Sequence, residues 1–323
     1  MKAIVQDNFG SADVLELRDV PDPVVGAGDV LLRVRAAGCG PDVWHLMTGL
    51  PYFVRIMPGF RKLKAGVRGR DAAGVVQAVG ADVTAFQPGD EVMGFVDGSF
   101  AELAIGRPEK LVRKPSRLTF EQAAAAPVSG VTAVQAIGQV GKVQPGQKVL
   151  VIGAAGGVGN LTVQVAKSAG AIVTGVCSTS KLDLVRSIGA DEVIDYTRED
   201  FADGRRRWEV IVDTAGNRSL GVLRRALTRR GILVIVGGEG GGRWTGGFFR
   251  QILRAPVLSL FTSQKLRPLI TSEKREDLQS LADLLEAGTV TPVVGKTYPL
   301  AEAREAVRFL AEGHAAGKIV ITI

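Results

Sequence analysis

The segment Gln147–Gly159 constrains the fold of this chain more than any other. Its sequence, Gln-Lys-Val-Leu-Val-Ile-Gly-Ala-Ala-Gly-Gly-Val-Gly, places an apolar strand before a glycine turn and the start of a helix. Gly156 would let the backbone approach a pyrophosphate, and Gly159 would let the helix pack closely against the strand. Helix N-terminal amides would then face the phosphates. The segment predicts a dinucleotide-binding βαβ unit of the Rossmann type, with a merely tight βα turn as the alternative.

The pattern after about residue 120 supports this prediction. Strands without polar alternation follow one another with amphipathic helices between them, which is typical of a parallel sheet covered on both faces. We expect strands at 149–152, 172–176, 193–195, 210–213 and 232–236, and helices near 158–169, 181–188 and 219–228. Ser180 is the expected N-cap of the second helix, and Gly189 its expected end.

The two ends of the chain have a different pattern. Short β segments broken by Pro and Gly predict a small, mostly antiparallel barrel from strands near 2–6, 14–19, 29–36, 74–79, 91–95 and 100–105. Later elements are expected at 275–287 (helix), 290–294 (strand), 301–312 (helix) and 318–323 (strand). We expect the closing strand to return to the first domain. The fold class is α/β, with a barrel domain at 1–124, a dinucleotide-binding domain at 125–265 and the return at 266–323.

The residues after the second strand indicate which dinucleotide is bound. An NAD site expects an Asp or Glu there to hold the ribose 2′-hydroxyl, but this chain has Cys177-Ser-Thr-Ser-Lys181. Ser178, Ser180 and Lys181 offer donors and a positive charge instead, and Tyr196 could add a hydroxyl. Capping is the alternative role for Ser180. Asp191 and Asp195 fall near the third strand and not at the ribose position, so we predict NADPH as the cofactor.

Composition and charge exclude several other classes of protein. No stretch of about 18 apolar residues is present, so a membrane span is not expected, and two cysteines fit a reducing cytoplasm. The formal charge of +7 includes an arginine triplet at 205–207 and arginine pairs at 224–225 and 229–230. A solvated surface explains these best; steering of an anionic cofactor and nucleic-acid binding are the alternatives. We expect a cytoplasmic protein with a small-molecule substrate and no nucleic-acid or membrane partner.

Motifs outside the glycine turn resemble one enzyme superfamily. They are Val34-Arg-Ala-Ala-Gly38, Trp44-His-Leu-Met-Thr-Gly49, Gly69-Arg-Asp-Ala-Ala-Gly74, Pro88-Gly-Asp-Glu-Val-Met-Gly94, Ser129-Gly-Val-Thr-Ala133 and Gly317-Lys-Ile-Val-Ile321. Together they resemble the medium-chain dehydrogenase/reductase superfamily, and most of all its zinc-independent quinone oxidoreductase-like branch. The resemblance implies a GroES-like catalytic domain, a Rossmann domain, a cleft between them and a homodimer.

The resemblance also assigns cofactor residues. It implies that Thr132 lies near the nicotinamide ribose, and that Ser178, Lys181 and Tyr196 lie near the adenosine phosphate. The full expected cofactor set is Thr132, Gly153, Ala155, Gly156, Gly157, Val158, Gly159, Ser178, Lys181, Tyr196, Gly237 and Lys318. One loop departs from the family pattern, because Gly40 replaces an Asn and Asp42 sits one position early.

A zinc site is not expected. Zinc-dependent relatives have zinc ligands at three positions, where this chain has Gly40, Arg70 and the thiol-free stretch 129–133. Zinc-dependent relatives also have a structural lobe with four cysteines, which a chain with two cysteines cannot form. The permanent charge of Arg70 would repel a divalent cation. Cys39, Asp42 and His45 could form an accidental ligand set, but a Cys beside a tight Gly-Pro turn is more often a small packed hydrophobe.

Without a zinc ion or a Tyr-x-x-x-Lys pair, the remaining chemistry is hydride transfer controlled by proximity and orientation. Quinones and α,β-unsaturated carbonyls suit such a site because conjugation delocalises the developing charge. Tyr52, His45 and Arg70 are candidates to hydrogen-bond the acceptor oxygen. Each also has a structural alternative: Tyr52 as a loop anchor, His45 as a polar helix position, and Arg70 as an ion-pair partner of Asp71 or another acid. A zinc-free dehydrogenase of another substrate class and a non-catalytic NADPH-binding protein are the competing functions.

Overall fold

The computed structural model describes residues 1–52, 55, 66–237 and 246–323, and the chain divides into two compact units. Unit 1 comprises Met1–Val131 together with Glu273–Ile323, and unit 2 comprises Thr132–Ser272. Both predicted limits, 124 and 265, fall earlier in the chain than these boundaries. Unit 2 is thus a continuous stretch of chain inserted into unit 1.

A mostly antiparallel sheet forms the centre of unit 1. Its strands, in the order β14-β15-β3-β5-β6-β7, are Val294–Pro299, Lys318–Thr322, Val30–Cys39, Asp71–Val79, Glu91–Asp97 and Leu103–Arg113. An additional pairing of β3 with β7 closes four of these strands into the predicted barrel. β15 pairs with β3, Ile319 opposite Cys39, so the closing strand returns to the first domain as expected.

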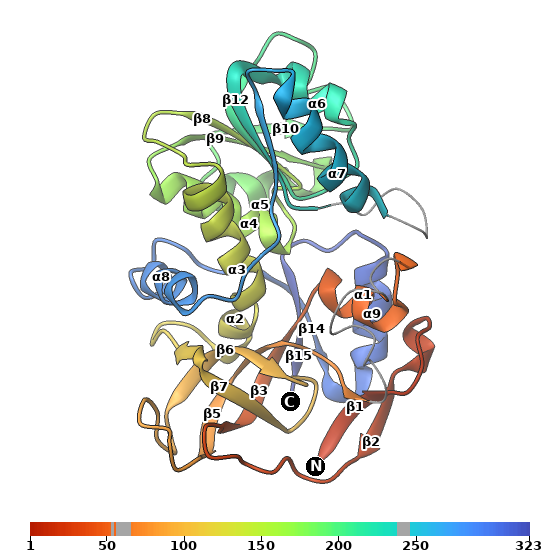
Figure 1. Cartoon of the computed structure of the whole chain (residues 1–323), viewed down its shortest axis with the longest axis vertical. Helices are drawn as coiled ribbons and strands as arrows, with labels where there is room; N and C mark the ends of the chain where they lie inside the picture. Colours follow the sequence, from red (N-terminus) through yellow and green to blue (C-terminus); the bar gives the residue numbers. More distant parts are fainter. Residues whose placement is uncertain (53–54, 56–65, 238–245) are drawn as a thin grey trace. The chain divides into compact units, whose positions relative to one another are not determined.

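The other elements of unit 1 surround this sheet. A three-stranded sheet in the order β2-β1-β4 consists of Glu16–Asp19, Lys2–Gln6 and Gly66–Val67, and Figure 1 shows β1 and β2 side by side. The α-helices are α1 (Pro41–Thr48), α2 (Phe120–Ala124), α8 (Arg275–Glu286) and α9 (Ala303–Ala311), with short 3-10 turns η1 (Ala12–Val14) and η6 (Leu300–Glu302). α3 (Pro127–Val134) runs from unit 1 into unit 2. α2 begins with a capping box between Thr119 and Gln122.

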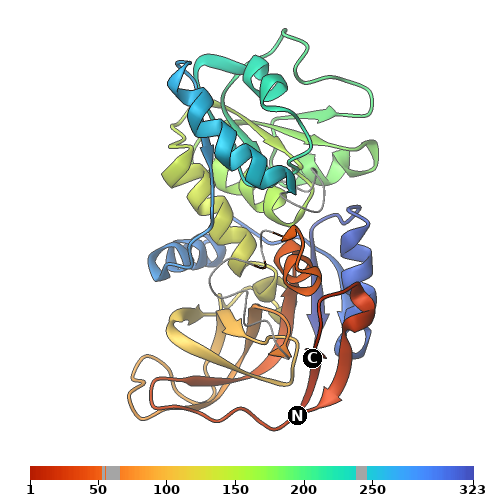
Figure 2. The same ribbon diagram turned by 45° about the vertical axis from the view of Figure 1, so that its right-hand side comes forward.

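Unit 2 contains a parallel sheet, as the sequence predicts. Its strands, in the order β10-β9-β8-β11-β12-β13, are Glu192–Asp195, Ile172–Cys177, Lys148–Ile152, Trp208–Asp213, Leu227–Ile235 and Lys265–Pro268. A helical segment, η4 (Gln135–Val140), precedes the first of these strands. Further helical segments lie between the strands: α4 (Gly157–Ser168), η5 (Thr179–Lys181), α5 (Leu182–Ser187), α6 (Leu220–Ala226) and α7 (Gly246–Leu260). Figure 2 shows α7 running across the sheet of this unit. The strand order reverses between β8 and β11, the position where doubly wound sheets bind ligands.

The core of unit 2 explains the lack of polar alternation in its strands. Leu150, Ile211 and Leu233 come from three neighbouring strands and are fully buried in one cluster with Trp208 and Leu223. Full burial of each such side chain contributes roughly 1.5–3 kcal/mol to the hydrophobic free energy of folding. A sheet covered on both faces buries every residue of its central strands, so the pattern is a continuous apolar run.

Two local predictions are wrong. Ser180 does not cap α5, because a 3-10 turn precedes that helix and the N-cap position falls on Lys181, without a side-chain capping bond. The hydroxyl of Thr179 is bonded to Asp195, which fixes the turn ahead of the helix. The strand expected at 290–294 begins only at Val294, where pairing with β15 starts, because Pro292 offers no N–H for a ladder. α7 and β13 were not predicted.

Candidate functional site

The turn between β8 and α4, with the start of α4, holds half of the expected cofactor residues. Gly153 has a φ of +80°, which favours glycine, and Gly156 is the N-cap of α4 without a side-chain capping bond. A Cβ on Gly159 would lie 2.0 Å from the Gly153 carbonyl oxygen, so the predicted close packing of helix on strand is confirmed. A Cβ on Gly156 would meet only that same oxygen, at 3.4 Å, and otherwise faces open space.

Backbone amides give this turn its chemistry. The N–H groups of Gly157, Val158 and Gly159 lie in the first turn of α4, where an α-helix supplies no partners for them. The side-chain amide of Asn160 donates to the Gly156 and Gly157 carbonyls at 2.8 Å each, which stiffens the turn. Together with the helix dipole, these amides form a site suited to an anionic phosphate group. The residues present therefore fit a dinucleotide.

The neighbouring strand ends contribute residues that sequence reasoning missed. Thr214 follows β11, and its hydroxyl donates to the Ile152 carbonyl at 2.8 Å. Asp213 is fully buried and accepts bonds from the Ala215 and Gly216 amides at 3.2 and 2.9 Å. Burial raises the pKa of Asp213 to about 6. The signal that could have found both residues is their place at the end of the predicted strand 210–213.

Gly237 follows β12, the strand next to β11 in the sheet, and so lies at the carboxyl edge of the sheet where the cofactor residues are expected. A Cβ there would lie 2.1 Å from the Thr214 carbonyl oxygen, so glycine is required for the close approach of the two chain segments. Ala155, in the glycine turn, is buried. The packing of both residues is therefore fixed by the protein itself, and their contact with a cofactor stays a prediction.

The segment after β9 holds the expected phosphate contacts. Ser178 is the N-cap of η5, again without a side-chain capping bond, and Lys181 ends that turn. Burial lowers the pKa of Lys181. Tyr196 follows β10 and is half-exposed. Their contact with a 2′-phosphate stays a prediction.

The structure also brings an acid beside this segment. Asp195 lies opposite Cys177 in the β9–β10 register. Its carboxylate accepts hydrogen bonds from Thr179 and from the amide and hydroxyl of Thr197, and these bonds lower its pKa. Asp195 therefore lies at the third strand, as the sequence indicates. It is nevertheless closer to the segment predicted to bind the 2′-phosphate than its place in the chain suggests.

Thr132 lies at the start of unit 2, away from the glycine turn in sequence. It is buried, and its hydroxyl lies 2.8 Å from that of Thr271. Three residues later, the Gln135 side-chain amide donates to the Ser272 carbonyl at 2.7 Å. These bonds join the first and last segments of unit 2 and fix the position of Thr132.

Lys318 belongs to unit 1, where the structure gives it a buried acidic partner. Its ammonium lies 3.1 Å from Asp71 Oδ2 and 3.3 Å from Ser129 Oγ, and both charged groups are almost completely buried. The Val128 amide donates to Asp71 Oδ1 at 3.1 Å. Burial opposes the charge on Lys318, but the carboxylates of Asp71 and Asp42 outweigh it and raise its pKa. Lys318 is therefore a buried cation in unit 1.

The departure from the family pattern at Gly40 is explained by the same cluster. A Cβ on Gly40 would lie 2.7 Å from Asp42 Oδ1 and 2.8 Å from the Lys318 ammonium. Glycine at this position leaves the space that these two charged ends occupy. Cys39 is packed in the core of unit 1, and burial raises the pKa of its thiol to about 12, so the expectation of a packed hydrophobe is confirmed.

Each of the three candidates for the acceptor oxygen has a partner in unit 1. His45 Nδ1 lies 2.7 Å from the Leu50 carbonyl oxygen, and the Arg55 guanidinium lies 4.8 Å from the centre of the Tyr52 ring. Arg70 forms an ion pair with Glu273, not with Asp71, and its side chain is 42% exposed. The structure thus supports the alternative of an ion pair with another acid for Arg70.

Two family models match this chain. The alcohol dehydrogenase GroES-like domain matches residues 26–116, and the zinc-binding dehydrogenase model matches residues 188–321. A chloroplast envelope quinone oxidoreductase homolog of Arabidopsis thaliana is 30% identical over 99% of this chain and 98% of its own length. The chain belongs to the medium-chain dehydrogenase/reductase superfamily. It lies in the quinone oxidoreductase-like part of this oxidoreductase superfamily, as the motifs indicate.

Further relatives and solved structures agree with this family assignment. The 2-methylene-furan-3-one reductase of Solanum lycopersicum is 32% identical over 99% of this chain and 79% of its own length. The quinone oxidoreductase of Coxiella burnetii superposes with a TM-score of 0.87 at 28% identity, covering 100% of this chain and 99% of that one. A mycobacterial protein solved in complex with NADPH gives a TM-score of 0.85 at 27% identity, with full coverage of both chains.

The zinc ion named in one family model does not fit the residues present. Gly40 has no side chain to offer, and Arg70 is an ion-paired cation. Across residues 1–52, 55, 66–237 and 246–323, no three His, Cys, Asp or Glu side chains are grouped to hold a metal ion. No chemical step is therefore assigned to zinc.

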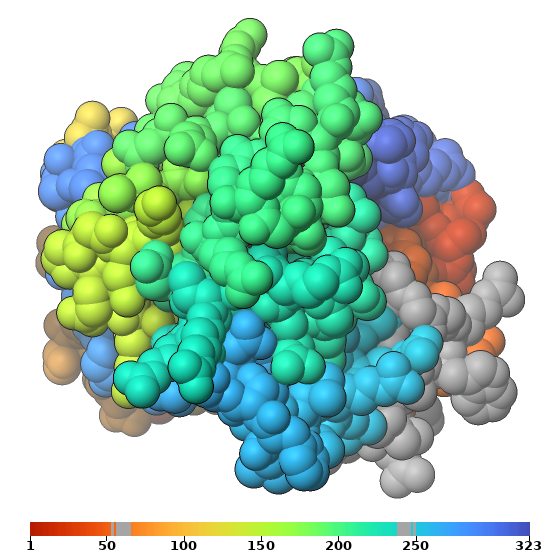
Figure 3. Space-filling model, turned by 90° about the horizontal axis from the view of Figure 1, so that it is seen from above, coloured from red at the N-terminus to blue at the C-terminus, as the bar shows by residue number. Residues whose placement is uncertain are grey.

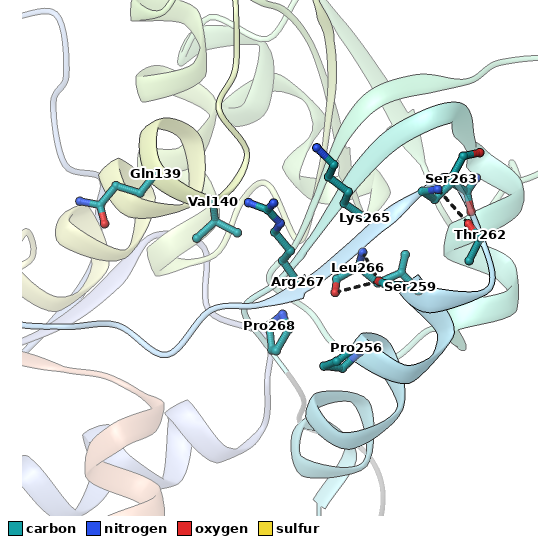
Figure 4. Close-up of a pocket in the computed structure, with 11 residues that line it drawn as sticks. Gln139, Val140, Pro256, Ser259, Thr262, Ser263, Lys265, Leu266, Arg267 and Pro268 are labelled. Atoms are coloured by element: carbon teal, nitrogen blue, oxygen red, sulfur yellow. Dashed lines mark hydrogen bonds between the residues drawn. The ribbon is translucent and has the colours of Figure 1, made fainter.

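Unit 2 also has a hollow outside the β8–α4 turn. It is a groove of about 630 Å³ between η4 and β13, lined by Gln139, Val140, Pro256, Ser259 and residues 262–268 (Figure 4). None of the predicted cofactor or catalytic residues lines this groove.

Within the described part of the chain, no helix has the length and apolarity needed to cross a membrane.

Proposed function

We propose that this protein transfers a hydride from NADPH to a quinone or an α,β-unsaturated carbonyl compound. The observation that carries the proposal is the β8–α4 turn, where three helix N-terminal amides and an uncapped Gly156 form an anion site at the switch point of the sheet. The two relatives described above are named as a quinone oxidoreductase homolog and as a reductase of a 2-methylene-furan-3-one, a conjugated ketone.

The residues would divide the task as follows. The α4 amides hold the pyrophosphate, Ser178 and Lys181 hold the 2′-phosphate, and Thr132 contacts the nicotinamide ribose. Bound NADPH supplies the hydride. Tyr52, His45 or Arg70 donates a hydrogen bond to the acceptor oxygen, and water supplies the proton that completes the reduction. Since conjugation spreads the developing charge, orientation provides most of the rate acceleration.

The preference for NADPH is tested by titrating both reduced cofactors. We expect Lys181→Ala to weaken NADPH binding about ten- to a hundredfold, because a charge-assisted phosphate contact is worth roughly 1.5–3 kcal/mol, and to leave NADH binding unchanged. Arg186→Ala is the matched control, because that arginine is on the next helix and pairs with Asp183. Equal wild-type affinities for the two cofactors would overturn the assignment.

The reaction is tested with 1,4-benzoquinone, an alkenone and ethanol. We expect reduction of the conjugated acceptors and almost no oxidation of ethanol with NADP⁺, because alkoxide formation near neutral pH needs a metal or a well-placed base. Chelators should leave the activity unchanged. Efficient ethanol oxidation without quinone or alkenone turnover would refute the proposal. The homodimer implied by the family is checked separately by sedimentation velocity.

A further inference from the structure

The helix α7 has two apolar faces, and only one of them is buried. Ala255 is fully buried and Leu258 packs against the same core cluster of unit 2. The opposite side presents a stripe that we call the outer face of α7: Leu253, Val257, Leu260 and the adjoining Phe261, exposed by 75%, 55%, 81% and 82%. Their spacing puts them on one side of the helix. Figure 3 shows α7 and the segment after it, in blue, at the surface of unit 2.

The charges around this stripe have one sign. Residues 246–272 contain no Asp or Glu, but they contain Arg250, Arg254, Lys265 and Arg267. Arg250 and Arg254 are exposed, and their spacing puts them on the same side of the helix as the apolar residues, Arg250 before Leu253 and Arg254 directly after it. The outer face therefore combines exposed apolar side chains with a positive charge, which is typical of helices that lie on anionic lipid surfaces.

The adjacent sheet edge argues against a second copy of this chain as the occupant. β13 is the edge strand, and the Leu266 N–H donates to Ser259 Oγ at 2.8 Å (Figure 4). The Gln264 N–H donates to Thr262 Oγ1 at 2.8 Å, and Pro268 has no N–H. Alternate positions along the strand thus offer no donor for pairing with another strand. In a twofold contact through the outer face, the same positive patch would also face itself.

We propose that the outer face of α7 binds the surface of an anionic lipid membrane. Leu253, Val257, Leu260 and Phe261 enter the boundary between headgroups and acyl chains, while Arg250 and Arg254 pair with lipid phosphates. This docking revises the expectation of no membrane partner, which rested on the lack of a spanning segment. It does not depend on which acceptor the enzyme reduces.

The test is co-sedimentation of the full-length protein with phosphatidylcholine vesicles that contain or lack phosphatidylserine. We expect binding only to the anionic vesicles, weakened by salt. Leu260→Gln with Phe261→Gln should weaken it about a hundredfold, because each side chain contributes roughly tenfold or more through burial. Arg250→Gln with Arg254→Gln should weaken it roughly 25-fold, about fivefold for each charge.

Val24→Gln is the matched control, because Val24 is an exposed apolar residue of unit 1 (90%) and should not affect binding. Circular dichroism confirms that each variant is folded. Failure of the wild type to sediment with either vesicle, or equal binding by all variants, would overturn the proposal. So would a dimer that Leu260→Gln with Phe261→Gln dissociates in the absence of any vesicle binding, since the stripe would then be a contact between copies.

Discussion

The β8–α4 turn of unit 2 and the Gly40 region of unit 1 both depend on glycine, but for opposite reasons. In the turn, glycine exposes backbone amides and leaves open space in front of Gly156. At Gly40, the missing side chain is replaced by the charged ends of Asp42 and Lys318, so the space is filled from within. One region leaves the first backbone amides of a helix open, and the other is filled by the protein's own charged side chains. A glycine in a motif therefore indicates that another group approaches the backbone closely. It does not indicate whether that group is a ligand or a side chain of the protein itself.

Removing the cation of the Gly40 region should have the largest effect. We expect Lys318→Met to lower the free energy of unfolding by about 3–5 kcal/mol, because Asp71 would remain buried without its counter-charge. Chemical denaturation measures this loss. Lys110→Met is the matched control, since the Lys110–Glu273 pair is partly exposed and should contribute less than about 1 kcal/mol. Adding Asp71→Leu to Lys318→Met should restore much of the stability. Similar losses of stability in Lys318→Met and Lys110→Met would contradict the comparison.

Two alanine substitutions in the turn separate packing from ligand binding. Gly159→Ala should cost about 3 kcal/mol of stability, because its Cβ would lie 2.0 Å from a backbone oxygen. Gly156→Ala should cost less than about 1 kcal/mol and instead weaken NADPH binding at least roughly tenfold, because its Cβ points into open space. Thermal unfolding and cofactor titration distinguish the two. Unchanged NADPH affinity in Gly156→Ala would remove this turn from the cofactor site.

Asp213 adds a pH dependence to unit 2. Its folded pKa of about 6 lies above the ordinary value of 3.8, so its contribution to stability is complete below 3.8 and is lost as the pH rises through 6. We expect Asp213→Asn to gain roughly 2–3 kcal/mol relative to wild type between pH 4 and pH 7. Urea unfolding at both pH values measures the difference. A constant difference would show that Asp213 does not titrate in this range.

Arg70→Gln should change the free energy of unfolding only slightly. Because Arg70 and Glu273 are both partly exposed, the loss of their ion pair should cost less than about 1 kcal/mol. If Arg70 donates to the acceptor oxygen, kcat/KM for a quinone should fall about tenfold while NADPH affinity stays constant. Steady-state kinetics provides the check. Unchanged turnover would leave Arg70 with its structural role alone.

The two regions also differ in how much of their structure could be predicted from the sequence. The turn was predictable because glycines between a strand and a helix act through the backbone, which the local sequence determines. The pairing of Lys318 with Asp71 was not, because the two residues are brought together only when β15 joins the sheet beside β3 and β5. For the same reason, Arg70 could be assigned an acidic partner but not Glu273 in particular. Asp195 lies closer than expected to the segment predicted to bind the 2′-phosphate, because neighbouring parallel strands end at the same edge of the sheet.

The pairing of β15 with β3 has a consequence for the order of folding during synthesis. Ile319 must reach Cys39, so the barrel sheet cannot be completed until the ribosome has made the chain as far as β15. Unit 2 is one continuous stretch, and every strand of its sheet is available once Ser272 has emerged. Domains generally fold as units while the chain is being made. The inserted domain can therefore finish folding first, and the barrel then closes around a lysine that arrives last to neutralise Asp71.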